Sequence, residues 1–336
     1  MEDYPIKTVP DVANWSENYA LAGFDPASGI DLFLALGRWR KDLTLWREMV
    51  GIALPDGTIL AHRAIGDSLN TKDAPGATNL KITIDEDGSR QTWSFRGAAR
   101  RVTAEQLSSE ILIDGPLEPV SFECSFISAL PGWDLGSGGK ASAMAGHAHL
   151  EQIGRVAMDI RVAGEAMRFD SQVNRDHSRG PRVVGKLTRH VWCHGIFENG
   201  FAFQAYEAYE GDDPESGPVF SKACVYREGR AIPASLTFGP RLPDADPLKH
   251  IRDPQTIVLR FEGEEVELVA EAFPTVIHIQ FTKPWDNYFG ARQIGSNPTR
   301  RLVEQSIRYR IKGGTKGYGH MERTVPGAIL DDLQLT

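Results

Sequence analysis

Residues 194–203 read His-Gly-Ile-Phe-Glu-Asn-Gly-Phe-Ala-Phe, and this stretch decides the fold class. Asn199-Gly200 separates two apolar runs, a strong signal for a β-hairpin whose two turn positions both need positive φ. Similar turn signals stand between other apolar runs: Pro55-Asp56-Gly57, Asp85-Glu86-Asp87-Gly88, Glu228-Gly229 and Glu262-Gly263. Many short strands with a turn about every ten residues predict an antiparallel sandwich or barrel.

Helical patterns are scarce in the chain. Apolar residues between Gly29 and Trp46 fit a helical period, but they fit a pair of strands nearly as well, so both interpretations stay open. Residues 298–305 are a candidate short helix. The sequence therefore predicts an all-β protein with few short helices.

The length of 336 residues is large for one hydrophobic core and favours two domains. The best candidate junction is near 180–186, after Gly180-Pro181-Arg182. We therefore predict an N-terminal domain over 1–182 and a C-terminal domain over 183–336.

Charge and cysteine content narrow the class of protein. The net charge is −8 and the basic residues are scattered, which argues against binding to nucleic acid or to an anionic membrane. Three distant cysteines make a poor disulfide framework and favour a reducing compartment. No apolar run approaches the roughly 20 residues of a spanning helix, so we expect no membrane insertion and a cytoplasmic location. A homo-oligomer remains open.

His147, His149 and Glu151 would share one face if their segment is a strand. Two imidazoles and a carboxylate can bind a metal, although they also suit the wall of a barrel. The His-x-His opening resembles that of cupins, but the cupin carboxylate lies a few residues later than Glu151. We therefore predict no tightly bound transition metal and include these three residues among the substrate-binding candidates.

Arg175-Asp176-His177-Ser178 is the centre of a polar segment that contains almost nothing to drive burial. An aspartate beside a histidine can orient the imidazole and raise its basicity, so we expect Asp176 and His177 to form a hydrogen-bonded pair. Arg175 and Arg182 would keep Asp176 ionised, whereas an apolar pocket would raise its pKa and make it a proton donor. An ion-paired corner that clamps the two domains explains the same residues equally well.

Two further segments supply substrate-binding candidates. Trp192 and His194 alternate with Cys193 on one strand, where a tryptophan can line a pocket or simply fill the core. Tyr318 and His320 lie in a glycine-flanked segment near the C-terminus, which also fits a bulged closing strand. The sequence contains neither a glycine-rich phosphate loop followed by Lys-Ser/Thr nor a Gly-x-Ser-x-Gly elbow, so nucleotide binding and serine hydrolysis lack support.

The segment 175–182 resembles the Arg-Asp-His-Ser-Trp-Gly-x-Arg signature of the hydroxyneurosporene synthase (carotenoid 1,2-hydratase) and AttH-like superfamily. Looser similarity extends over Trp15–Gly29, His149–Gly164 and Gly317–Glu322. The resemblance implies two tandem lipocalin-like antiparallel β-barrels. The sequence departs from the family pattern at Arg179, where the family usually has Trp. A charged side chain at this position suits an acidic or oxygenated ligand better than a pure hydrocarbon.

The resemblance also implies cofactor-independent acid–base chemistry on a large apolar terpenoid, steroid or aromatic natural product. The activity would be that of a lyase or isomerase: hydratase, cyclase or double-bond isomerase. Asp176 would be the acid, His177 its partner or the base that activates water, and Arg175 and Arg182 framing charges. Arg179 and Arg182 join the substrate-binding candidates. The alternative is a non-catalytic carrier of an apolar small molecule, as a barrel allows.

Overall fold

The computed structural model describes eleven segments: 2–13, 15–39, 42–67, 75–108, 115–136, 146–181, 187–210, 217–239, 249–282, 286–289 and 300–326. The chain divides into two compact units. The first comprises Met1–Thr103 and Ile113–Val184, and the second comprises Ala104–Leu112 and Gly185–Thr336. The second unit therefore includes a short segment from within the first 182 residues.

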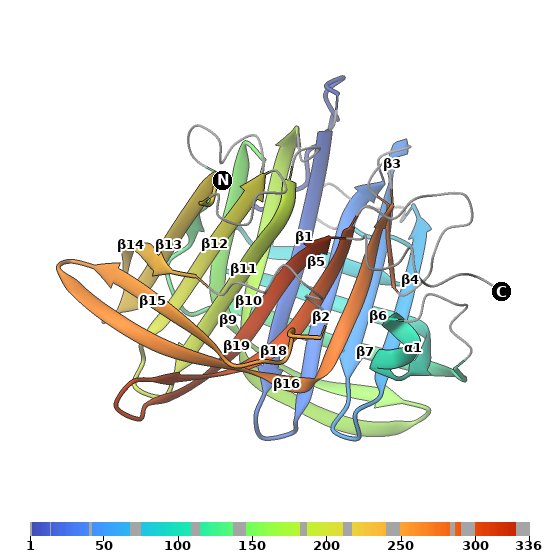
Figure 1. The fold of residues 1–336 in the computed structure, drawn as a ribbon. Coiled ribbons are helices and arrows are strands. Elements are labelled where there is room, and N and C mark those ends of the chain that lie inside the picture. Colours follow the sequence, from blue (N-terminus) through green and yellow to red (C-terminus); the bar gives the residue numbers. More distant parts are fainter. Residues whose placement is uncertain are drawn as a thin grey trace. The chain divides into compact units, whose positions relative to one another are not determined.

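The first unit is an antiparallel barrel (Figure 1). Its strands are β1 (Trp15–Asp25), β2 (Ile30–Trp39), β3 (Asp42–Ala53), β4 (Ile59–Gly66), β5 (Leu80–Glu86), β6 (Arg90–Val102), β7 (Leu117–Ser128), β8 (Trp133–Asp134), β9 (Ala148–Val162) and β10 (Glu165–Pro181). Eight of them follow one another in the order β10-β1-β2-β3-β4-β6-β7-β9, and pairing of β9 with β10 closes the ring. The strands β5 and β8 pair with β6 and β9 from outside this path.

The second unit repeats the plan. It contains α1 (Ala104–Ser108), β11 (Leu187–Phe197), β12 (Ala202–Glu210), β13 (Phe220–Arg227), β14 (Arg230–Phe238), β15 (Gln255–Phe261), β16 (Glu264–Thr282), β17 (Asp286–Phe289), β18 (Arg300–Ile311) and β19 (Lys316–Pro326). Eight strands run in the order β15-β14-β13-β12-β11-β19-β18-β16, and β15 pairs with β16 to close the barrel. The predicted all-β class with two antiparallel barrels is therefore confirmed.

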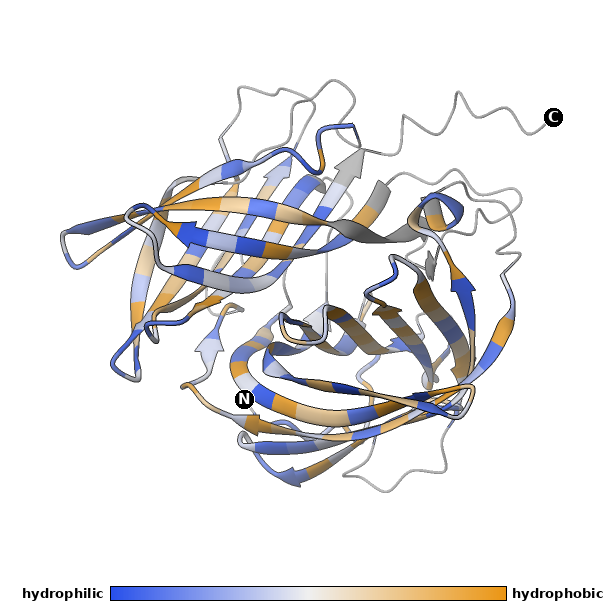
Figure 2. Cartoon of the chain, turned by 90° about the horizontal axis from the view of Figure 1, so that it is seen from below, coloured by the Kyte–Doolittle hydropathy of each residue, from blue (hydrophilic) through white to orange (hydrophobic). Residues whose placement is uncertain are grey.

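Alternating burial builds both cores. Successive residues of a strand point to opposite faces, and Figure 2 shows apolar and polar residues alternating along the strands of both barrels. The first core includes Trp93, Phe95 and Phe126, and the second includes Phe203 and Tyr309. Removing this apolar surface from water is the main favourable term in folding each barrel.

The hairpin that identified the fold class is present, with a different turn from the expected one. Phe197 pairs with Phe201 across a three-residue loop, Gly200 has φ of 82°, and Asn199 is not among the residues with positive φ. A turn ending in one left-handed glycine is the usual form of such a loop. The hairpins at Glu228-Gly229 and Glu262-Gly263 do have two successive residues with positive φ.

Two segments clarify the helix predictions. Residues 30–39 and 42–53 are the strands β2 and β3, so the apolar period between Gly29 and Trp46 belongs to a strand pair. The helix predicted over 298–305 is wrong for its described residues, because Arg300–Ile311 is strand β18 and pairs with strands on both sides. Cross-strand pairing overrides local propensity there.

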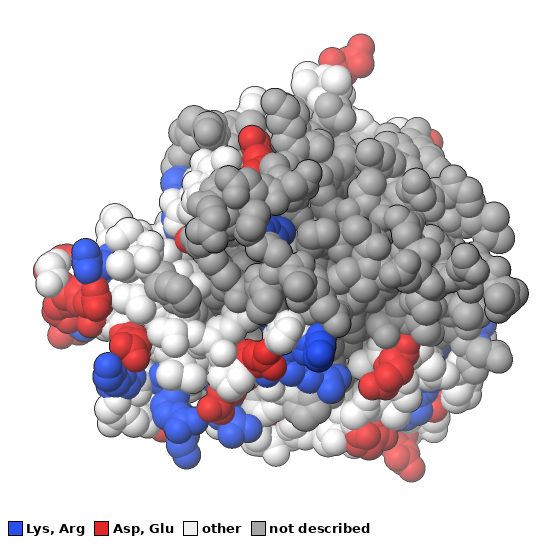
Figure 3. Space-filling view, in the orientation of Figure 1, with Lys and Arg blue, Asp and Glu red and all other residues white. Residues whose placement is uncertain are grey.

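The charged surface agrees with the scattered distribution of charge in the sequence. On the face drawn in Figure 3, positive and negative side chains of the described residues are intermixed. Among the described residues, no helix has the length and apolar character needed to cross a bilayer.

The close packing of β9 against β7 depends on Gly154. A Cβ atom at this position would lie 2.3 Å from ring carbons of Phe126 and 2.5 Å from the backbone oxygen of Ile127. Because the backbone of β7 cannot give way without breaking the barrel, Gly154→Ala is expected to lower the free energy of unfolding by about 1–3 kcal/mol in urea titrations. Gly217→Ala, where a Cβ meets nothing within 4 Å, is the matched control. Equal stability of the two variants would contradict this packing argument.

Candidate functional site

The segment Arg175-Asp176-His177 lies in the regular part of β10, so its side chains alternate between the two faces of the first barrel. Val173 belongs to the core, and Arg175 and His177 follow it on the inner face. Asp176 points to the outer face. The expected hydrogen bond between Asp176 and His177 is therefore wrong, because adjacent residues of a strand cannot meet.

Arg175 is fully enclosed within the first unit. Its guanidinium donates two hydrogen bonds of 2.8 Å to the carboxylate of Asp3 and others to Oε1 of Gln152. Such a two-pronged contact is the strongest arrangement of arginine and carboxylate. Arg175 thus has its charge neutralised inside the barrel, and the prediction that it keeps Asp176 ionised is wrong.

His177 lies in the same internal network. Its ring stacks on Tyr19 at 4.0 Å between centroids, and Nε2 lies 3.4 Å from Oε1 of Glu17. Glu17 is held in turn by Arg38, whose Nε donates a hydrogen bond of 2.8 Å. These contacts attach the N-terminal residues to β10 within one unit, and they explain why a polar sequence can be buried.

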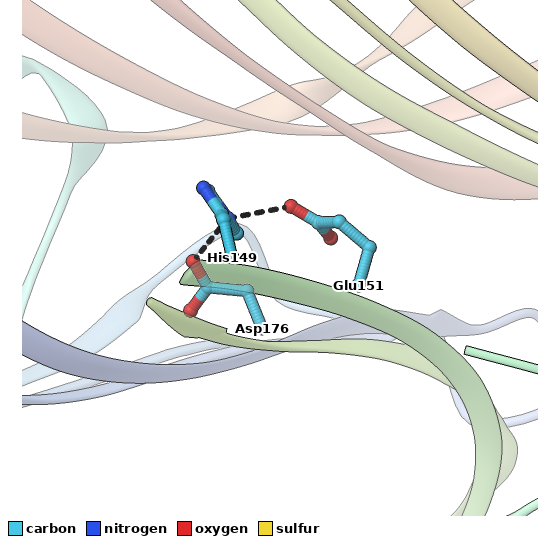
Figure 4. A group of neighbouring side chains, drawn as sticks. All are labelled: His149, Glu151 and Asp176. Atoms are coloured by element: carbon cyan, nitrogen blue, oxygen red, sulfur yellow. Dashed lines mark ion pairs between the residues drawn. The ribbon is translucent and has the colours of Figure 1, made fainter. Parts of the chain in front are cut away.

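The outer face of β9 and β10 carries a different cluster, drawn in Figure 4. His149 and Glu151 come from β9 and Asp176 from β10, where the register places Asp176 opposite Glu151. Nε2 of His149 lies 2.9 Å from Oε1 of Glu151 and 3.0 Å from Oδ2 of Asp176. Asn174 donates a hydrogen bond of 2.7 Å to the other oxygen of Glu151. We call His149, Glu151 and Asp176 the β9–β10 triad.

Burial sets the protonation of this triad. Glu151 is fully buried, and its burial raises its pKa. Burial alone would lower the pKa of His149, but the contacts with Asp176 and Glu151 outweigh that effect and raise the pKa to about 9. At neutral pH, the imidazole is therefore protonated and lies between two carboxyl groups.

The remaining candidates in the first unit are not part of the triad. His147 precedes β9 and is exposed, because Gly146 with φ of 97° turns the chain before the strand begins. The expected shared face of His147, His149 and Glu151 is therefore wrong for His147. Arg179 donates a hydrogen bond to the backbone oxygen of Tyr4, and Arg182 lies outside the described residues.

In the second unit, Trp192 and His194 share the outer face of β11, as expected, while Cys193 points into the core. Tyr318 and His320 lie on β19, whose register places His320 opposite His194. The ring of Tyr318 stacks on Phe273 at 6.4 Å. The C-terminal segment is thus a regular closing strand of the second barrel.

Several residues of these networks were not singled out in the sequence. Asp3 and Gln152 hold Arg175, and Glu304 binds His320 with 2.7 Å between Oε2 and Nε2. Glu17 and Gln152 lay within two stretches of the family resemblance, which was the available signal. The partners of the others are far apart in the chain, so only strand pairing brings them together.

The triad can perform one of two kinds of chemistry. A proton held between an imidazole and two carboxyl groups can be transferred to a bound molecule. The same three residues offer one ligand atom each within 4.8 Å of one another, a geometry that a divalent metal also accepts.

A family profile described as "Domain of unknown function (DUF7064)" matches residues 2–326, so the chain belongs to this family. A comparison with curated proteins finds no match. The family itself carries no stated activity, and the fold comparison is therefore the more informative one.

Three solved structures share the fold. A candidate AttH protein from Nitrosomonas europaea has a TM-score of 0.57 at 13% identity, covering 95% of this chain and 98% of that one. CghA in complex with Sch210972 has a TM-score of 0.53 at 11% identity, covering 97% and 96%. Kievitone hydratase from Nectria haematococca has a TM-score of 0.52 at 10% identity, covering 94% and 90%. The AttH-like resemblance is thus confirmed for the fold.

The internal network should make stability depend on pH. Burial alone would raise the pKa of Asp3, but His177 and Arg175 hold it well below the usual range. A carboxyl group with a lowered pKa stabilises the fold fully above its unfolded pKa of about 4 and loses that effect as the pH falls toward its folded pKa. We expect Asp3→Asn to lower the free energy of unfolding by about 3–5 kcal/mol at pH 7.

The measurement is urea unfolding between about pH 7 and pH 2, with exposed Asp11→Asn as the control. Wild type should lose stability more steeply than Asp3→Asn below about pH 4. Parallel curves would show that Asp3 does not titrate with folding.

The metal prediction from the sequence can be tested on the triad itself. The proton held by His149 competes with a metal for the same atoms, so we expect no stoichiometric zinc, iron or manganese after dialysis. Elemental analysis of wild type and His149→Ala checks this. A metal that survives dialysis and disappears in the variant would contradict the prediction.

Proposed function

We propose that this protein is a cofactor-independent acid–base enzyme of the hydratase or cyclase type, a lyase or isomerase whose substrate is a large apolar terpenoid, steroid or aromatic natural product. One observation carries the proposal: a buried imidazole lies 2.9 and 3.0 Å from the carboxyl oxygens of the β9–β10 triad. Two of the proteins with the same fold, kievitone hydratase and CghA with its bound Sch210972, agree with this class.

Asp176 is the member of the triad that would touch the substrate. Its side chain retains 15% of its exposure, against 7% for His149 and none for Glu151. Oδ2 contacts His149, while Oδ1 makes no hydrogen bond within the described part of the chain. A buried carboxyl oxygen without a partner is costly and is suited to a substrate group or a water molecule.

His149 and Glu151 would control the proton. The imidazolium passes a proton to Asp176 before each transfer and takes it back once the carboxylate has been reprotonated, and Glu151, oriented by Asn174, stabilises the charged ring. Holding the three groups on paired strands of a closed barrel keeps their geometry fixed without a cofactor.

The proposed step begins when Asp176 has received the proton of the His149 imidazolium. The π electrons of a substrate double bond form a new C–H bond with this proton, which leaves a carbocation and the Asp176 carboxylate. In a hydratase, water adds to the cation and gives its proton back to the carboxylate. In a cyclase, a second double bond attacks the cation to form a C–C bond and a new cation, which then loses a neighbouring proton to the carboxylate. In an isomerase, the first cation loses a neighbouring proton to the carboxylate directly. Each route returns the proton, so no net oxidant or reductant is needed.

The cysteines are the basis for the cellular compartment that we propose. Cys124, Cys193 and Cys224 are buried and free, which suits a reducing compartment such as the cytoplasm. Burial raises the pKa of the Cys193 thiol, so it is not an activated nucleophile, and we assign it no catalytic role.

The test uses turnover in D2O with a panel of prenylated phenols, terpenoids and polyenes. Carbon protonation by the enzyme adds one non-exchangeable deuterium to the product, which mass spectrometry detects whichever reaction follows. Asp176→Asn should retain the fold and reduce turnover by about 10²–10⁴-fold, because the amide cannot transfer the proton.

Asp170→Asn is the matched control, since Asp170 lies on the same face of β10 in an exposed ion pair with Arg155. Unchanged turnover in Asp176→Asn with a lowered melting temperature would overturn the catalytic role. Tight binding of a panel member without deuterium incorporation would favour the carrier alternative.

A further inference from the structure

The second barrel carries its own group of polar side chains on the face opposite its core. The strand register places six residues in two adjacent rows, Trp192–Glu322–Glu304 and His194–His320–Ser306. We call these six residues the outer patch. Their chain neighbours Cys193 and Met321 belong to the core, so the alternation of the strands directs the patch outward from the barrel.

Several polar atoms of the outer patch are buried and make no hydrogen bond within the described part of the chain. His194 is fully buried, Trp192 retains 6% of its exposure and Ser306 retains 1%. Both ring nitrogens of His194, the indole nitrogen of Trp192 and Oγ of Ser306 make no hydrogen bond within the described part of the chain. Each buried polar atom without a partner costs free energy, and a group of three on one face needs an explanation.

The carboxyl groups of the patch, by contrast, belong to a chain of hydrogen bonds. Thr324 and Glu322 each approach His190 to 2.5 Å, Glu322 is hydrogen-bonded to Glu304, and Glu304 contacts His320 at 2.7 Å. A hydrogen bond between two carboxyl groups requires one shared proton. His194, Trp192 and Ser306 lie outside this chain of hydrogen bonds and can therefore bind a ligand.

The rings of the patch face one another at similar distances. Centroids lie 5.9 Å apart for Trp192 and His194, 6.1 Å for Trp192 and His320, and 6.2 Å for His194 and His320. His194 and His320 are nearly parallel at 19°. Three rings in this arrangement offer edges and faces to a flat ligand.

The charges of the histidines and carboxyl groups in the patch determine the charge of the ligand that it can bind. Burial lowers the pKa of His194 well below its usual value and that of His320 to about 4, so both rings are neutral near pH 7. The carboxyl pair Glu304–Glu322 retains negative charge, because one shared proton cannot neutralise both groups. The outer patch is thus unsuited to an anion and suited to a neutral group that both donates and accepts hydrogen bonds.

We propose that the outer patch binds the hydroxyl or carbonyl group of an uncharged, ring-containing ligand, with His194, Trp192 and Ser306 as its hydrogen-bonding partners. The indole N–H donates, while the serine hydroxyl and the neutral imidazole each donate or accept. This binding site is independent of the proton transfer proposed for the β9–β10 triad.

Equilibrium dialysis with three probes of one shape tests the proposal at pH 7: 2-naphthol, naphthalene and 2-naphthoate. Wild type should bind 2-naphthol about tenfold more tightly than naphthalene, as one or two hydrogen bonds predict, and should bind 2-naphthoate least tightly. The variants are His194→Phe, which keeps a flat ring without nitrogen atoms, and Ser306→Ala, which changes only one hydroxyl.

In His194→Phe, the preference for 2-naphthol over naphthalene should fall to near unity while the affinity for naphthalene is retained, and Ser306→Ala should reduce the preference several-fold. His250→Phe makes the same replacement at a partly exposed histidine of the second unit and should change nothing.

Four outcomes would overturn the proposal. These are equal binding of 2-naphthol and naphthalene by wild type, tightest binding of 2-naphthoate, no binding of any probe, and an unchanged preference in both patch variants. A raised melting temperature of His194→Phe with unchanged binding would identify the patch as a structural cluster. Ser306→Ala keeps the test valid if His194→Phe does not fold.

Discussion

The alternation of side chains along β10 is the constraint on which the rest of the first unit depends. It divides one short polar sequence between two environments: His177 enters the barrel, and Asp176 leaves it. In the inner environment, Arg175 and Asp3 satisfy one another's charges. On the outer face, the triad retains an Asp176 carboxyl oxygen without a hydrogen bond in the described part of the chain.

The inner and outer clusters therefore differ in the direction in which the pKa values of their carboxyl groups are shifted. Inside, Arg175 faces a carboxylate whose pKa is lowered, so the pair is stable as a pair of ions. Outside, burial raises the pKa of Glu151 while the pKa of His149 is raised by its neighbours. The first arrangement fixes charges, whereas the second raises the pKa values of both a carboxyl group and an imidazole that lie next to each other. Perturbed pKa values in a cluster with an unpartnered carboxyl oxygen are typical of functional sites, which is why we assign chemistry to the outer cluster.

Much of this architecture was accessible from the sequence, and the reasons for the failures are specific. Turn dipeptides such as Glu228-Gly229 predicted hairpins because positive φ is a local property of glycine and its neighbour. The segment 174–182 identified the fold through a family resemblance. The prediction of an Asp176–His177 pair failed because the polar segment is part of strand β10, where adjacent side chains point to opposite faces. Asp3 was missed because its partner Arg175 lies 172 positions away.

The second barrel shows how the same constraint separates a structural histidine from a functional one. His190 has partners at both ring nitrogens, Thr324 and Glu322, and its surroundings account for it fully. His194, two residues along the same face, has none among the described residues and is fully buried. A sequence pattern cannot distinguish these two histidines, since both alternate with apolar neighbours. The difference arises from the adjoining strand, which presents a carboxylate beside one ring and only a second neutral imidazole beside the other. Burial with partners accounts for His190, and burial without them is the observation on which we assign a ligand to His194.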